Sequence, residues 1–232
     1  MLKISDILID QVVKEAKKRE DEHESSGRLS ASMLGNPLQW QVLKYLGVKP
    51  KEFDNYTYCK FQRGRDVEDF VFNKVVASGV KADSQKRANY RDVVGLIDIF
   101  IPEPKEIIEV KSTTNGAFKY IVKEGMAKQN HILQACLYAL SEGLDEFSLV
   151  YIASDDYRSC QFQYRTADYK DKVDEIIDTF EETIKAKKIP KFEAIEKWQT
   201  IDRYSMYPEW TKLNTLQLNK KAKELYRWNQ FF

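Results

Sequence analysis

The chain has 232 residues, of which 43% are hydrophobic, and its 37 basic and 36 acidic side chains leave a formal net charge of +1. Nine glycines and six prolines are too few for a collagen-like or low-complexity chain, and the near-zero charge excludes a histone-like polycation. The longest apolar run, residues 93–101, is interrupted by Asp98 and is too short to span a bilayer. With no recognisable signal peptide, we expect a cytoplasmic protein without membrane contact.

Cysteine and histidine usage excludes two kinds of small stabilised domain. The three cysteines, Cys59, Cys136 and Cys160, lie far apart along the chain, and the only histidines are His23 and His131. A disulfide framework and a Cys/His zinc site are therefore both disfavoured.

The N-terminal part is predicted to be helical. Ser5 can cap a first helix whose apolar residues share one face, and the charged stretch 14–24 is typical of a solvated helical end. A second helix is expected from Asn36, with Pro37 at its first position. Apolar spacing predicts a third helix over 61–76.

Two runs rich in Val and Ile then predict a β-hairpin, because they bracket Pro102-Glu103-Pro104-Lys105. Further elements are expected in this order: a helical stretch at about 117–142, strands at 146–153 and 159–165, a long amphipathic helix at 167–187, and an aromatic tail ending in a basic helix. The order predicts an α/β fold with a mixed central sheet. We expect one domain, divided into an N-terminal helical segment (1–60), a core (61–190) and a C-terminal aromatic and helical extension (191–232).

The hairpin carries charged residues within apolar strands. If its turn centres between Glu103 and Pro104, Asp98 faces Glu109 across the two strands. Lys111, two residues beyond Glu109, projects from the same face. The other face is expected to be apolar and to collect Val93, Ile97, Ile99, Ile101, Ile108 and Val110.

Opposed carboxylates repel each other and are costly to bury, and a divalent cation between Asp98 and Glu109 would remove both problems. Oxygen ligands suit Mg²⁺ or Mn²⁺. The alternative is that Lys111 forms salt bridges with both carboxylates at a solvated sheet edge.

The spacing from Asp98 to Glu109-Val110-Lys111 resembles the signature of the PD-(D/E)XK nucleases, and the flanks GLIDIF and IIEVKS are similar to those of the RecB-like branch. Gly64 to Glu68 is similar to the upstream G-x-x-x-E motif, and Gln134 to Tyr138 is similar to the downstream Q-x-x-x-Y motif. The resemblance covers about residues 28–165. It implies a restriction-endonuclease-like core, a central mixed β-sheet flanked by helices.

The resemblance also implies roles at a metal site. Asp98 and Glu109 would be direct ligands of Mg²⁺ or Mn²⁺, with the Val110 carbonyl as a main-chain ligand. Glu68 would be a third ligand or would order a ligand water. Lys111 would position or deprotonate the attacking water, or offset negative charge in the transition state.

Further residues are expected to contact DNA. Gln134 and Tyr138 are one helical turn apart, and His131 lies on the same face. The resemblance implies that this face adjoins the metal site and the DNA backbone. The other candidate DNA-binding residues are Ser30, Ser32, Arg63, Arg65, Ser112, Thr113 and Lys119.

Three basic stretches, residues 57–65, 111–131 and 211–232, could track phosphates or could be solvated helix faces. The aromatic residues of the tail are compatible with base stacking, but the pattern favours packing or subunit contact.

Arg28-Leu29-Ser30-Ala31-Ser32, followed by a helix, resembles the opening segment of CRISPR-adaptation and viral RecB-like exonucleases. Many of those hold an iron–sulfur cluster through cysteines after this segment and near the C-terminus. Here Asn36-Pro37 occupies the first region, and no cysteine lies between Trp198 and Trp210, so we expect no cluster.

These features predict a Mg²⁺- or Mn²⁺-dependent DNA exonuclease acting on single strands or duplex ends, in DNA recombination, repair or replication. The alternatives are a structure-specific endonuclease of the same fold and a catalytically inactive nucleic-acid-binding module.

Overall fold

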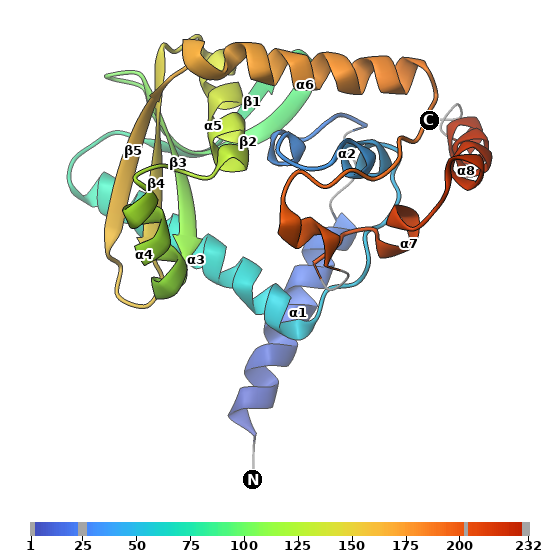
Figure 1. Cartoon of the computed structure of the whole chain (residues 1–232). Helices are drawn as coiled ribbons and strands as arrows, with labels where there is room; N and C mark the ends of the chain where they lie inside the picture. The colour runs from blue at the N-terminus through green and yellow to red at the C-terminus, as the bar shows by residue number, and fades with distance from the viewer. Residues whose placement is uncertain (1–2, 23–26, 202–203, 229–232) are drawn as a thin grey trace.

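The computed structural model describes residues 3–22, 27–201 and 204–228. A five-stranded sheet with the order β1-β2-β3-β4-β5 lies on one side of the molecule (Figure 1). Its strands are β1 (Asp83–Tyr90), β2 (Val93–Ile101), β3 (Glu106–Thr113), β4 (Glu146–Ala153) and β5 (Ser159–Arg165). The β3–β4 pair is parallel, and the other neighbouring pairs are antiparallel. Because β3 is the middle strand, it is hydrogen-bonded on both sides.

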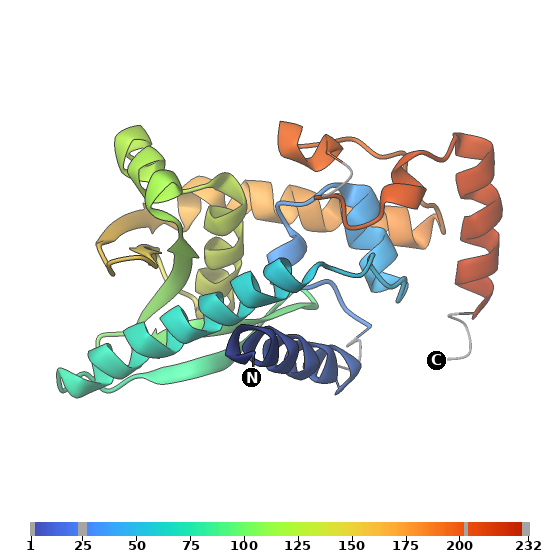
Figure 2. The same cartoon turned by 90° about the horizontal axis from the view of Figure 1, so that it is seen from below.

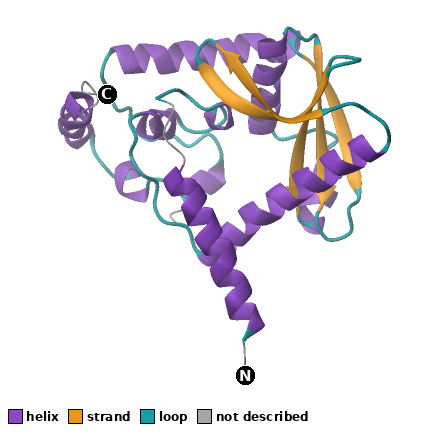
Figure 3. Ribbon diagram, turned by 180° about the vertical axis from the view of Figure 1, so that it is seen from behind, coloured by secondary structure: helices purple, strands orange, loops and turns teal. Residues whose placement is uncertain are grey.

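Helices cover both faces of the sheet (Figure 3). They are α1 (Ile4–Glu22), α2 (Leu38–Tyr45), α3 (Asn55–Ala77), α4 (Asn115–Glu124), α5 (Gln129–Glu142), α6 (Ala167–Lys185), α7 (Pro208–Thr211) and α8 (Thr215–Trp228), with short 3₁₀ turns η1 (Ala31–Met33) and η2 (Lys197–Thr200). Helix α3 packs on β2 and β3, while α5 packs on β1 to β4 and is itself covered by α6. The predicted α/β fold with a mixed sheet flanked by helices is confirmed.

The hairpin has the predicted register. Ile101 lies opposite Glu106, and the ladder continues to the pair Ile99 and Ile108. The next pair in this register is Asp98 and Glu109, and there the main-chain ladder stops. Instead, the Val110 N–H donates to Asp98 Oδ2 at 2.8 Å. The strands therefore separate at the two carboxylates.

The regular alternation of side chains between the two faces of the sheet is broken in β2 at Asp98. Val93 and Ile97 lie in the main core with α5, whereas Ile99 belongs to a second apolar cluster under α3. The prediction that all three share one face is therefore wrong. The physical reason is an interruption of the β1–β2 ladder opposite Asp98, where Gln85 adopts a left-handed φ of 54° and breaks the regular alternation.

Several predicted boundaries shift. Strands β4 and β5 have the predicted bounds, but the helical stretch at 117–142 is two helices, because Gly125 ends α4 with a left-handed φ of 67°. Pro37 directly precedes α2 and is not its first residue. Helix α3 begins at Asn55, before the predicted residue 61. Its cap is Asp54, whose carboxylate accepts from the Thr57 N–H at 2.7 Å.

The C-terminal extension folds back onto α2, as Figure 2 shows. The fully buried Trp40 stacks on Phe192 with ring centroids 5.7 Å apart and lies 6.5 Å from Trp198. Tyr207 and Tyr226 are also buried. The predicted packing role is confirmed for these rings, while the Trp228 side chain, Phe231 and Phe232 lie outside the described residues.

None of the described helices combines the length and apolar character needed to cross a bilayer. The three cysteines are unpaired thiols on α3, α5 and β5.

Candidate active site

The site is built around Glu109 on the middle strand. This side chain is only 1% exposed, and its Oε1 lies 2.5 Å from the Lys111 ammonium. Its Oε2 has no hydrogen-bond partner among the described residues. The alternative placed the Lys111 salt bridge at a solvated sheet edge. That placement is wrong, because Glu109 and Lys111 form a buried pair on the central strand.

The three charged groups of the hairpin change one another's ionisation. Burial, reinforced by the charge of Asp98, raises the pKa of Glu109 to about 8. Burial also raises the pKa of Asp98. For Lys111, burial acts to lower the pKa, but the two carboxylates outweigh it and raise the pKa above its usual value. Burial therefore makes the ionised carboxylates costly, and a cation close by would lower that cost.

Helix α3 brings a third carboxylate to the hairpin. Burial and the neighbouring Asp98 raise the pKa of Glu68 to about 7. One turn earlier, a Cβ built on Gly64 would lie 3.8 Å from Ser112 Oγ, so the helix passes close to β3 at that point. The structure therefore brings Glu68 together with Asp98 and Lys111, as the sequence predicts, and puts Ser112 beneath the helix.

Helix α5 approaches the hairpin from the opposite face. Lys111 Nζ donates to Gln134 Oε1 at 3.3 Å, and Gln134 Nε2 donates to the Tyr138 hydroxyl at 3.0 Å. The Tyr138 ring lies against Gly95 of β2, where an added Cβ would be 2.6 Å from Cε1. Burial raises the pKa of Tyr138, so the phenol stays protonated. The predicted helical face therefore adjoins the carboxylate cluster.

His131 is fixed by a residue that sequence reasoning missed. Its Nδ1 lies 2.7 Å from the hydroxyl of Tyr151, which accepts from the Lys128 N–H at 3.1 Å. Burial, and then the charge of Lys111, lowers the pKa of His131. Tyr151 lies opposite Lys111 in the parallel β3–β4 ladder. Only knowledge of that pairing could have placed it here, since β4 carries no motif.

The serines near the N-terminus also reach this region. Ser30 forms a bridge with Val94 of β2, and its Oγ lies 3.0 Å from Ser32 Oγ. Between them, the Ala31 Cβ would be 3.0 Å from a Cβ on Gly95, which itself contacts Tyr138. Ser30 and Ser32 therefore flank the segment that packs beside Tyr138.

The remaining candidates lie around the cluster. Arg63 and Arg65 precede Glu68 on α3, and each has a buried Nε without a partner among the described residues. The Thr113 carbonyl accepts from Ser154, and Lys119 on α4 interacts with Asp156 in the β4–β5 turn. Neither observation connects Thr113 or Lys119 with the carboxylates.

The donor set fits a divalent cation. In the described part of the chain, no three His, Cys, Asp or Glu side chains are arranged as a ready metal cluster, and the Lys111 ammonium lies on one side of Glu109. However, Glu109 Oε2 is an unpartnered buried acceptor, and Asp98 and Glu68 add carboxylate oxygens close by. Hard oxygen donors of this kind suit Mg²⁺ or Mn²⁺.

Two solved structures share this architecture. The SSO0001 protein aligns with a TM-score of 0.56 and 14% identity over 92% of this chain and 99% of that chain. LHK-Exo, an alkaline exonuclease from Laribacter hongkongensis, aligns in its complex with dAMP with a TM-score of 0.51 and 16% identity over 70% of this chain and 92% of that chain. The chain shares the α/β fold of these two structures.

No protein-family model and no curated protein matches the sequence. At these identities the likeness establishes the fold alone, and the chemistry of the site has to be argued from the residues themselves.

Proposed function

We propose that the protein is a divalent-metal-dependent deoxyribonuclease that hydrolyses phosphodiester bonds from the ends of single-stranded or duplex DNA, in recombination, repair or replication. The observation that carries the proposal is the juxtaposition of Asp98, Glu109 and Lys111 where the β2–β3 ladder ends. A purely structural ion pair does not explain a buried Glu109 Oε2 without a partner, because such groups are rare in folded proteins.

Asp98, Glu109, the Val110 carbonyl and Glu68 would hold Mg²⁺ or Mn²⁺. When bound, the metal supplies Lewis-acid stabilisation of the phosphate and a water of lowered pKa. The prediction that the protein has no iron–sulfur cluster stays a prediction, which the visible absorption spectrum of the purified protein tests.

Lys111 would act on the charge that develops on the phosphoryl oxygens. Its raised pKa keeps the ammonium protonated at neutral pH, and contacts with Glu109 and Gln134 hold it in position. A fixed positive charge in a buried site stabilises a developing oxyanion more than the same charge in water does. It can also orient a water, because an ammonium has three donor hydrogens.

Tyr138 would donate to the DNA backbone. Its oxygen already accepts from Gln134, so the hydroxyl proton is available for a phosphate oxygen. His131 would hold this end of α5 through Tyr151. Ser30 and Ser32 would contact the same strand, with Arg63, Arg65, Ser112, Thr113 and Lys119 as further DNA contacts.

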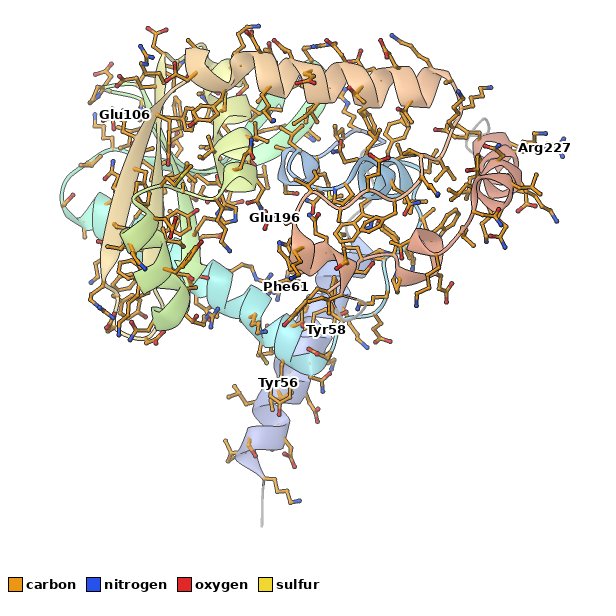
Figure 4. All side chains as sticks on the ribbon, viewed as in Figure 1. Tyr56, Tyr58, Phe61, Glu106, Glu196 and Arg227 are labelled. Atoms are coloured by element: carbon orange, nitrogen blue, oxygen red, sulfur yellow. The ribbon has the colours of Figure 1, made fainter. Side chains whose placement is uncertain are left out.

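The test is a time course on end-labelled single-stranded, duplex and closed circular DNA with Mg²⁺, Mn²⁺ or chelator. We expect linear DNA to be degraded only with metal. Glu109→Gln should abolish cleavage, because the amide keeps the shape but not the charge. The matched control is Glu106→Gln on the same strand, since Figure 4 shows Glu106 at the far end of the sheet.

Each other outcome identifies a competing function. Nicking of closed circles would indicate an endonuclease of the same fold. Salt-dependent DNA binding without turnover in either metal would indicate an inactive binding module. Full activity in Glu109→Gln would contradict the assignment of the site.

A further inference from the structure

A hollow lies beside the candidate site, and we call it the α1–α3 pocket. It is bounded by α1, the end of α2 with the loop after it, the N-terminal half of α3, and Met206 and Tyr207 of the extension. Its volume of about 970 Å³ is at the upper end of the roughly 300–1,000 Å³ typical of ligand pockets. Its lining carries one acidic residue, Glu52, and six basic residues: Lys17, Arg19, Lys44, Lys49, Lys51 and Arg65.

Two arginines converge on a single neutral oxygen in this pocket. Arg19 Nη2 donates to Gln62 Oε1 at 3.0 Å, and Arg65 Nη2 donates to the same atom at 2.8 Å. Burial lowers the pKa of Arg65 and the charge of Arg19 lowers it further, while the charges of Asp66, Glu68 and Glu15 oppose this lowering in part. Two guanidinium groups held together in this way repel each other, and an anion between them would relieve the repulsion. A phosphate group has the geometry that paired guanidinium groups bind.

Two lysines that line the same pocket, Lys44 and Lys49, add to its positive charge. Among the described residues, no acidic side chain pairs with Lys44 or Lys49. Lys44 is exposed, yet enough protein surrounds its ammonium that burial lowers its pKa. Lys44 is thus reachable from solvent and still surrounded by protein atoms, as expected for a residue that lines a pocket. The pocket therefore concentrates positive charge where an anion can enter.

An aromatic cluster lies within the same wall. Phe61 is 43% exposed, and its ring packs edge-on against Phe53 at 5.3 Å and Tyr58 at 6.4 Å. Figure 4 shows Tyr58 and Phe61 on the N-terminal half of α3, where this helix passes α1. An exposed flat ring beside cations is the arrangement that binds unpaired bases, because every base has a face that stacks.

The α1–α3 pocket and the candidate active site are neighbours along α3. Arg65 lines the pocket, and Glu68 follows three residues later, about 4.5 Å along the helix axis. The charge of Arg65 contributes to the ionisation of Glu68. A strand lying on this side of α3 would pass from the aromatic cluster to the carboxylates.

We propose that the α1–α3 pocket binds unpaired DNA next to the bond that is cut, with a backbone phosphate at Arg19 and Arg65 and a base stacked on Phe61. The inference rests on the proposed function and defines the substrate further, as a single strand. Inside a duplex both faces of a base are covered by neighbouring bases, so an aromatic ring such as Phe61 favours the bases of an unpaired strand.

The test is binding of fluorescein-labelled oligothymidine to the full chain in chelator, followed by anisotropy over a range of salt concentrations. Phe61→Leu keeps an apolar side chain against Phe53 but removes the ring face, and it should weaken binding by at least about fivefold with an unchanged salt slope. Arg19→Gln removes one of the two guanidinium groups at the proposed phosphate, so it should weaken binding and reduce the slope of log K against log salt by about 0.7, the value for one phosphate contact on a single strand.

The matched control is Lys81→Gln, since this exposed lysine follows the far end of α3, a helix of 23 residues and about 34 Å. It should bind oligothymidine as the wild type does. Thermal unfolding of each variant checks that the fold is retained.

Failure of this inference is distinguishable from failure of the proposed function. If the pocket variants bind oligothymidine as tightly as Lys81→Gln while the wild type cleaves DNA, the pocket assignment is overturned and the nuclease stands. If binding depends on the pocket but no DNA is cut, the nuclease fails and the pocket stands. Equal affinity for a duplex of the same length would overturn the assignment of an unpaired strand.

Discussion

The Lys111 ammonium lies 2.5 Å from Glu109 Oε1, while the other oxygen of the same carboxylate is buried without a hydrogen-bond partner among the described residues. Leaving a buried polar atom without a hydrogen-bond partner costs about 1–3 kcal/mol. A divalent cation held by Glu109 and Asp98 would satisfy this oxygen.

Metal should stabilise the fold through this site. At a free Mg²⁺ or Mn²⁺ concentration of ten times its dissociation constant, the free energy of unfolding should rise by about 1.4 kcal/mol. For a chain of this size that corresponds to an increase of about 3–6 °C in Tm. Asp98→Asn should lose the increase, whereas Glu106→Gln should keep it, as measured by thermal unfolding with metal and with chelator. An equal increase in Asp98→Asn would mean that the metal binds elsewhere.

Lys111→Met should separate catalysis from binding. The variant removes the ammonium but leaves the carboxylates, so kcat should fall by about 10²–10³-fold. The increase in Tm with metal should remain, and KM for single-stranded DNA should change little. Steady-state kinetics beside thermal unfolding checks this. A variant that no longer responds to metal would instead make Lys111 a structural partner of Glu109.

Gly95→Ala should damage the site through Tyr138. The new Cβ would lie 2.6 Å from Tyr138 Cε1 and 2.7 Å from its hydroxyl oxygen, so the ring must move. We expect a loss of about 1–3 kcal/mol in the free energy of unfolding, together with reduced kcat, because the displaced phenol no longer meets Gln134.

The control for this change is Gly116→Ala on α4, where a Cβ meets no other atom within 4 Å. There the same substitution should leave activity unchanged and change the free energy of unfolding by no more than about 0.5 kcal/mol, because Gly116 lies in the first turn of the helix. If denaturant unfolding gives equal effects for the two variants, close packing at Gly95 is wrong.

The ion pairs of Glu142, which lie away from the site, should make the free energy of unfolding depend on pH. Its Oε2 lies 2.8 Å from Lys86 and 3.4 Å from Lys105. Burial opposes its ionisation, but the two ammonium groups outweigh burial and hold the pKa below the usual 4.5. The stabilisation is therefore present above about pH 4.5 and is lost as the pH falls through the lower folded-state value.

Accordingly, Glu142→Gln should lower the free energy of unfolding by about 1 kcal/mol at pH 7 and have no effect below the folded-state pKa. Denaturant unfolding at a series of pH values measures this difference. Glu124→Gln, at the exposed end of α4, is the control. A difference that grows toward low pH would contradict the assignment.

The hairpin and its charged face were predictable because local chemistry determines them. A turn between two Val- and Ile-rich runs sets the register, and the register alone places Asp98 and Glu109 side by side. Strands β4 and β5 were predictable for the same reason, since apolar residues cluster within each run. The order of motifs then indicated which helices would meet the hairpin.

Strand β1 was not predictable, because its sequence DSQKRANY has no apolar alternation. It is an edge strand, and its pairing with β2 comes from the open hydrogen-bonding edge of that strand. The change of face at Asp98 and the position of Tyr151 beside His131 were also missed, since both depend on how neighbouring strands meet. The α1–α3 pocket was missed for a related reason: it joins residues from four separate segments.

The hydrogen bond from the Val110 N–H to Asp98 Oδ2 replaces a main-chain bond in the middle of the sheet. The backbone of β3 at the candidate site is thereby held by the Asp98 carboxyl, a group that can change its charge. Its amide proton should exchange with deuterium more slowly than those of an edge strand, and its chemical shift should follow the state of the carboxylate. One main-chain resonance would then report both the integrity of the sheet and the occupancy of the site.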